Sequence, residues 1–284
     1  MALTLRELKG RIRAAKKTQQ ITRTMQMVSA SRLKKSEETL RRAKPYYEKM
    51  ETILSHLMGS AEGVSHPFFE SREVKTIGLV VVTSDRGLCG GYNANIIAQA
   101  EAFLKTPRPQ PVKLILIGKK GADYFQKREW PILLKFVDLA GKPDYQKISA
   151  ITDQLVEAYL SGVLDEVHVL YTQFISALST KPVLKKFLNL GQEAGAKKTE
   201  FILEPSLQMI IDRFLTRQIA SRIYSALLES FTAENSSRMV AMKSATDNAQ
   251  EMIDRLSLMG NKARQAAITN EILEIVTAGE AMKT

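Results

Sequence analysis

The sequence predicts an α/β protein in which long N- and C-terminal helices form an antiparallel coiled coil beside a Rossmann-like central α/β domain. Two observations predict the coil: a heptad pattern over residues 1–58 and the absence of proline from residues 206–284. Between them, strand-like and helix-like segments alternate, which is typical of a largely parallel, doubly wound sheet. We expect an N-terminal helix at 1–58, a linker at 59–73, the α/β domain at 74–204 and a C-terminal helix at 205–284.

The N-terminal helix follows from its heptad spacing. Apolar or small residues recur at intervals of seven starting from Leu5 and from Leu8, with polar exceptions in the middle, and one register holds over eight heptads. From Gln19 to Ser36 this seam is polar or small, which predicts a different neighbour along that stretch. Pro45 removes one backbone hydrogen bond, so we expect it to bend the helix locally.

The C-terminal helix is predicted from the near absence of helix-breaking proline and glycine. Pro205 and Ser206, a plausible N-cap, mark its start, and only two glycines follow. At 1.5 Å per residue such a helix spans roughly 120 Å, so it needs a long partner, and the N-terminal helix is the obvious one. We expect its seam to consist of Met242, Ala245, Ala249, Met252, Leu256, Met259, Ala263, Ala266, Asn270 and Leu273.

The central domain is predicted from short apolar, β-branched segments separated by amphipathic ones. The expected strands are Val74–Thr83, Val112–Ile117, Leu133–Val137, Glu166–Gln173, Pro182–Leu190 and Glu200–Leu203. The expected helices are Tyr92–Leu104, Gly121–Arg128 and Tyr145–Leu160.

Charge and composition restrict the classes of partner. The net charge is +11, and residues 1–44 hold thirteen Lys/Arg against three Asp/Glu. Such a basic arm favours an acidic partner, whether nucleic acid, anionic lipid or an acidic protein surface, although a solvated basic face remains an alternative. The sequence has no apolar run of about 18 residues and no signal-peptide pattern at its start. The single cysteine, Cys89, excludes an internal disulfide and favours a location facing the cytosol.

A glycine-rich turn, Ser84–Asn93, follows the first predicted strand and opens a helix, which is where nucleotide-binding folds hold phosphate. Its spacing is neither G-x-G-x-x-G nor a P-loop, so a tight turn is the favoured interpretation. Cys89 could be a reactive thiol at a helix N-terminus, but a buried structural cysteine is favoured. The three histidines are isolated, and no Ser/His/Asp arrangement can be assembled. We therefore expect no catalysis, cofactor or metal.

Three segments carry a resemblance to a known family. They are Ile21–Leu33 (ITRTMQMVSASRL), the turn Ser84–Asn93 (SDRGLCGGYN), and a C-terminal pair, Arg238–Ala249 and Asn261–Val276. Together, in this order, they resemble the gamma subunits of F-type ATP synthases. The regulatory cysteine pair of the chloroplast form is missing, so the resemblance is to the bacterial type.

The resemblance implies a non-catalytic rotor shaft that couples proton translocation through the membrane ring to ATP synthesis or hydrolysis at the β subunits. It implies α and β subunits (three pairs per copy of this chain), an epsilon subunit and the membrane c-ring as partners, on the cytoplasmic face of a bacterial membrane. No cofactor is implied. The residues it implies in contact with β and the head are Arg23, Met25, Arg238, Arg264, Gln265, Thr269 and Glu271.

Two other functions are compatible with parts of the sequence. The basic arm would suit a coiled-coil protein that binds nucleic acid, but the arm lacks interleaved aromatic residues and the remaining residues are nearly neutral. The turn after the first strand would suit a nucleotide-dependent Rossmann enzyme, but its motif is weak. Strongly salt-dependent DNA affinity would favour the first, and nucleotide binding by the isolated chain the second.

Overall fold

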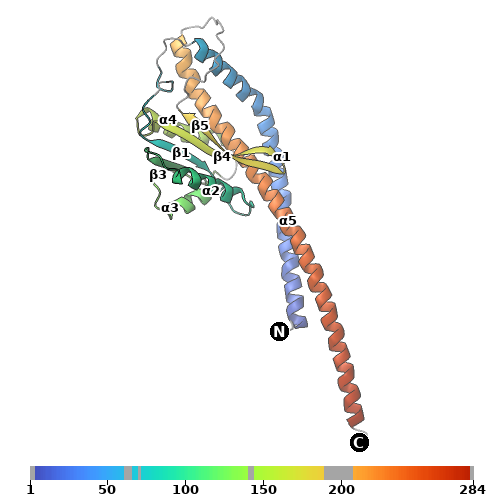
Figure 1. The fold of residues 1–284 in the computed structure, drawn as a ribbon. Helices are drawn as coiled ribbons and strands as arrows, with labels where there is room; N and C mark the ends of the chain where they lie inside the picture. The colour runs from blue at the N-terminus through green and yellow to red at the C-terminus, as the bar shows by residue number, and fades with distance from the viewer. Residues whose placement is uncertain (1–3, 61–65, 70–71, 140–143, 189–206, 282–284) are drawn as a thin grey trace. The chain divides into compact units, whose positions relative to one another are not determined.

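The computed structural model describes residues 4–60, 66–69, 72–139, 144–188 and 207–281. In this part of the chain two long helices, α1 (Leu5–Ser60) and α5 (Leu207–Ala281), flank a sheet with shorter helices (Figure 1). The predicted fold class is confirmed. The elements between the long helices are β1 (Ile77–Val82), α2 (Tyr92–Lys105), β2 (Val112–Ile117), α3 (Lys119–Gln126), β3 (Ile132–Phe136), α4 (Tyr145–Leu160), β4 (Glu166–Ser176) and β5 (Ser179–Leu188).

The chain forms two compact units, and each long helix belongs to both. The coil unit consists of Met1–Ser29 and Met239–Thr284, and the α/β unit consists of Ala30–Arg238. The limits of these two units differ from the domain boundaries that the sequence analysis placed at residues 58, 73 and 204. Those domain boundaries stay a prediction. Pro45 lies inside α1, and the helix continues through it.

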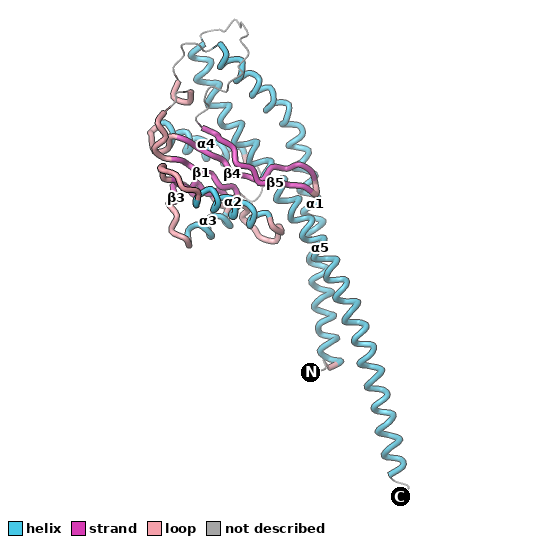
Figure 2. Tube along the Cα trace, viewed as in Figure 1, coloured by secondary structure: helices cyan, strands magenta, loops and turns pink. Residues whose placement is uncertain are grey.

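The sheet of the α/β unit has the strand order β3-β2-β1-β4-β5, and its strands are shown as magenta tubes in Figure 2. The first four strands in this order run parallel, while β5 is antiparallel to β4. The "largely parallel" expectation is therefore right for four strands. β5 is antiparallel because only Ala177 and Leu178 connect it to β4, and a parallel strand needs a crossover of a dozen or more residues. The predicted strand Glu200–Leu203 lies outside the described residues.

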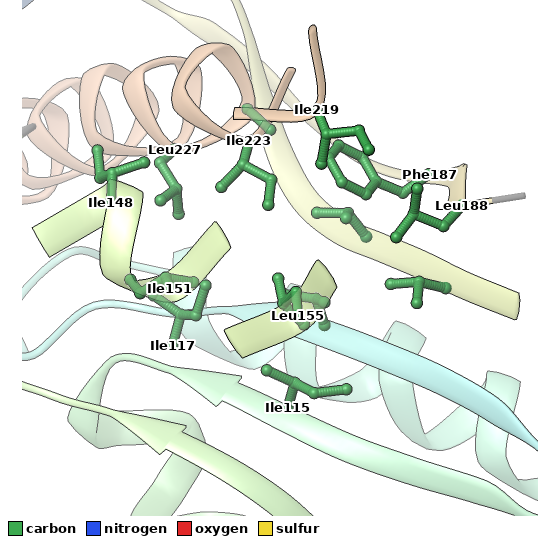
Figure 3. Close-up of a cluster of buried hydrophobic side chains, with 14 of the residues drawn as sticks. Ile115, Ile117, Ile148, Ile151, Leu155, Phe187, Leu188, Ile219, Ile223 and Leu227 are labelled. Carbon is green, nitrogen blue, oxygen red and sulfur yellow. The ribbon is translucent and has the colours of Figure 1, made fainter. Parts of the chain in front are cut away.

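Helices cover both faces of this sheet, as expected for a doubly wound fold. On one face α2 and α3 pack against alternate strand residues such as Leu79, Val81 and Leu116. On the other face α4 and α5 pack against the residues between them, including Val80 and Ile117. Figure 3 shows this second core, where side chains of α5 meet those of α4, β2 and β5; the labelled residues are Ile115, Ile117, Ile148, Ile151, Leu155, Phe187, Leu188, Ile219, Ile223 and Leu227.

In the coil unit the N-terminal part of α1 buries one position in every seven. These positions are Leu8, Ala15, Thr22 and Ser29, as the heptad pattern predicts. Two hydrogen bonds fix the pairing direction with α5. The Gln19 side chain donates to that of Gln250 at 2.7 Å, and the Thr246 hydroxyl donates to that of Thr22 at 2.8 Å. From the first pair to the second, the residue number rises in α1 (19 to 22) and falls in α5 (250 to 246), so the two helices are antiparallel.

The seam of α5 differs from the prediction by one residue at alternate positions. Met242 and Ala249 are buried as expected, but Met252 and Met259 are about half exposed, and Ile253 is buried instead. Both versions satisfy a mean spacing of 3.5 residues, so periodicity alone cannot separate them. The observed version places Thr246 opposite Thr22, where the two hydroxyls pair, and turns the bulky methionines outward.

Candidate partner-contact surfaces

The C-terminal end of α5 is a helix without cover on any side. Every residue from Arg264 to Ala278 is exposed. The segment is nevertheless apolar: Ile268, Ile272, Leu273, Ile275 and Val276 are 49–68% exposed. A stretch of large apolar side chains that stays open in a single chain marks an interaction surface. Four of the predicted contact residues lie on this segment: Arg264, Gln265, Thr269 and Glu271.

A second exposed surface lies on α1 in the coil unit. Arg23 is exposed and Met25 is partly buried. Around them, Ile21, Met27 and Val28 are 60%, 58% and 47% exposed. These apolar side chains lie away from the buried seam, as the sequence indicated for this part of the helix. The segment thus exposes apolar Ile21 and Val28 on one side of the helix and basic Arg23 on another, both available to partners other than α5.

Arg238 does not join these surfaces, because it is buried in the α/β unit at 8% exposure. Its guanidinium donates to the Glu234 carboxylate at 2.7 Å and to the backbone carbonyls of Arg86 and Gly87 at 3.3 Å. Burial raises the pKa of the Glu234 carboxyl, and the charge of Arg238 opposes that rise. The arrangement attaches α5 to the glycine-rich turn.

The glycine-rich turn uses many of its polar groups inside the fold. The Asn93 side chain accepts from the Ser84 amide at 3.0 Å, and Asp85 accepts from the amides of Lys119 and Asp138 at 3.0 and 3.2 Å. Asp85 therefore ties together the turns that follow β1, β2 and β3. Such internal bonding supports the interpretation of a structural turn, since a phosphate site needs backbone amides directed at the ligand.

Cys89 is buried at 2% exposure within this turn. The Asn93 amide donates to its sulfur at 3.2 Å. We predict that maleimide alkylates Cys89 at least about 100-fold more slowly in the native chain than in urea, because reaction requires local opening. Mass spectrometry of timed samples measures this ratio. Equal rates in the two conditions would contradict the placement of Cys89.

Sequence reasoning missed the partners of Arg238. Glu234 and Arg238 are spaced i, i+4, which does suggest an ion pair on a helix. Nothing in the sequence indicates that this pair is buried or that Tyr92 reaches the same helix, where its hydroxyl lies 2.6 Å from that of Ser230.

In the part of the chain that the structure describes, no three His, Cys, Asp or Glu side chains gather as a metal site. None of the described helices is long and apolar enough to span a bilayer.

Three comparisons with known proteins, by family model, by curated sequences and by solved structures, point to one family. A family model described as ATP synthase matches residues 4–282. The ATP synthase gamma chain of Moorella thermoacetica is 42% identical over 98% of this chain and 99% of its own length, and that of Pasteurella multocida is 38% identical over the same shares.

Two solved structures are similar in fold. A chain of the Tetrahymena thermophila mitochondrial ATP synthase, described as central stalk and c-ring, is 26% identical with a TM-score of 0.62, covering 79% of this chain and 99% of that one. A chain of the Euglena gracilis mitochondrial enzyme has a TM-score of 0.71 at 18% identity, covering 98% of this chain and 94% of that one. The second similarity supports the fold alone.

Proposed function

Since this chain belongs to the ATP synthase gamma-chain family, we propose that it is the central rotor shaft of an F-type ATP synthase. In this role it couples proton movement through the membrane c-ring to ATP synthesis or hydrolysis in the head of α and β subunits. The observation that carries the proposal is near-complete coverage of curated gamma chains at about 40% identity. Membership of this family also favours epsilon as a partner and a peripheral position on the cytoplasmic face of a bacterial membrane.

The exposed surfaces suit this role. The open apolar end of α5 would be surrounded by a ring of α and β subunits, and would then lose its contact with water. Arg23 and Met25 would both lie on the segment of the shaft near an acidic loop of β. Contacts of a turning shaft must be weak enough to slip, and exposed charge pairs worth less than about 1 kcal/mol meet that condition. Arg264, Gln265, Thr269 and Glu271 would contact the head.

The chain itself would perform no chemistry in this proposal. The nucleotide position of the α/β fold is taken up by a turn whose side chains bond within the fold. Catalysis would belong to the β subunits, with the shaft supplying only mechanical coupling. None of the reported similarities points to nucleic acid, so the basic arm is better explained by an acidic protein surface.

Reconstitution tests the proposal. The chain is mixed with α and β subunits, and any complex is isolated by size and assayed for ATP hydrolysis. We expect one copy per three αβ pairs, sustained hydrolysis by the complex and none by the chain alone. Failure to associate, or hydrolysis by the isolated chain, would reject the assignment. Salt-sensitive binding to DNA without association would favour the nucleic-acid alternative.

A further inference from the structure

Two turns of α5 are enclosed on all sides, which is unusual for this helix. Elsewhere in the described part of α5 partly buried or exposed residues interrupt the buried ones, but all seven residues from Ser230 to Ser236 are at most 5% exposed. This stretch ends just before Arg238, the last residue of the α/β unit, and Met239 begins the part of α5 that belongs to the coil unit. The helix is thus most tightly held where it leaves the α/β unit.

Polar contacts from two loops hold three residues of α5 within or just after this stretch: Ser230, Ser236 and Arg238. From the glycine-rich turn, Tyr92 bonds to Ser230 at 2.6 Å, and the carbonyls of Arg86 and Gly87 accept from Arg238. From the connection between β4 and β5, the carbonyl of Ala177 accepts from Ser236 at 2.6 Å. We call these groups of the two loops the collar.

The three anchored residues point in different directions around the helix. At 100° per residue, Ser236 lies about 240° and Arg238 about 80° around the axis from Ser230. The collar therefore grips the helix from opposing sides. Hydrophobic contacts, such as those of the α5 core further back, are non-directional. Hydrogen bonds require both distance and angle, so they resist rotation of the helix about its own axis.

The buried ion pair makes the grip specific. Glu234 and Arg238 are 5% and 8% exposed, and Arg32 of α1 adds a further positive charge near the carboxylate. Glu234 holds the guanidinium in place, and the remaining N–H groups of that guanidinium reach two carbonyls of the turn. Lysine could not reproduce this, because its ammonium lacks the planar fork.

We infer that the collar is the torque clamp of the rotor, with Arg238 and Glu234 as its positioning residues: it fixes α5 rotationally to the α/β unit where the helix becomes the shaft. The inference rests on the proposed function. It also assigns a role to a glycine-rich turn that occupies the nucleotide position of the fold. The turn binds a helix of its own chain instead of a phosphate.

The test measures the torsional stiffness of the rotor in the assembled complex of this chain with α and β subunits. A probe is attached to the α/β unit through a Lys127→Cys substitution at the exposed end of α3, since native Cys89 is buried. The angular fluctuation of the probe is recorded while the head pauses for ATP. A softer attachment between α5 and the α/β unit widens this fluctuation.

The main variant is Glu234→Gln with Arg238→Met, which removes both charges and leaves neither one buried alone. We expect the mean-square angular fluctuation to rise at least about twofold, with unchanged ATP hydrolysis. The matched control is Glu51→Gln with Arg222→Met, because that pair also joins α5 to another element of the same unit, through two contacts of 2.5 and 2.6 Å. The control should leave the fluctuation as in the parent.

Two gentler variants keep the test decisive if the main variant does not fold. Tyr92→Phe removes only the bond to Ser230, and Arg238→Lys keeps the charge but loses the fork. Each should widen the fluctuation, by less than the main variant. The inference would be overturned if the double variant, Tyr92→Phe and Arg238→Lys all showed the same angular fluctuation as the parent chain. It would also be overturned if the control variant widened the fluctuation as much as the double variant does. If the parent chain forms no complex with α and β, it is the proposed function that fails.

Discussion

Replacing Gly118 with alanine is expected to destabilise the α/β unit by more than about 3 kcal/mol. Gly118 has a φ of 96°, and a Cβ built on it would lie 2.1 Å from the carbonyl oxygen of Thr83. Neither backbone can move aside easily, because Thr83 donates to the Ile117 carbonyl and Gly118 to that of Phe136, both at 2.8 Å. The substitution therefore forces apart the ends of β1, β2 and β3.

Gly10→Ala is the matched control for this substitution. Gly10 lies in an exposed part of α1, and a Cβ there would meet nothing within 4 Å. Alanine favours the helix over glycine by roughly 1 kcal/mol, so this variant should be slightly stabilised. Urea unfolding of the purified chains, followed by circular dichroism, measures both. Equal midpoints for Gly118→Ala and the parent would mean that the backbones at Thr83 and Gly118 are not as close as described.

Features set by neighbouring residues could be predicted from the sequence. β2 and α4 have the predicted bounds, because a short β-branched segment and a 16-residue amphipathic helix each carry their own signal. The buried positions of α1 follow from a repeat of seven. The end of α5 was assigned as a contact surface only through the resemblance, and that assignment stays a prediction; the structure shows that its apolar side chains are exposed.

Features set by distant residues could not be predicted. Arg238 bonds to a turn 151 positions earlier, and no local pattern distinguishes that contact from an exposed position on a shaft. The seam of α5 has two versions with the same mean spacing, and only the opposite helix selects between Met252 and Ile253. The direction of β5 depends on a connection whose length was misjudged, because the strand starts at Ser179 and not at Pro182.

Replacing Met25 with lysine is expected to uncouple ATP hydrolysis from proton pumping in the complete enzyme, with assembly intact. Met25 is partly buried on α1, two residues after exposed Arg23. In the proposed placement a new ammonium here would face an acidic loop of β. An added attraction of about 1–2 kcal/mol in one rotor position corresponds to roughly a 5–30-fold bias toward that position. The rotor would then no longer leave each position at the rate that coupling requires.

The measurement is ATP-driven acidification of membrane vesicles, divided by ATP hydrolysis in the same vesicles. We expect this ratio to fall at least about fivefold in Met25→Lys, and to recover at high salt, because screening weakens the new attraction. Met25→Gln tests loss of the methionine without a charge, and Met27→Lys places the same charge about 200° around the helix at a side chain that is 58% exposed. Both should remain coupled. A normal ratio in Met25→Lys would refute the placement of Met25 against β, whereas an equal loss in Met27→Lys would show that any added charge on this segment disturbs rotation.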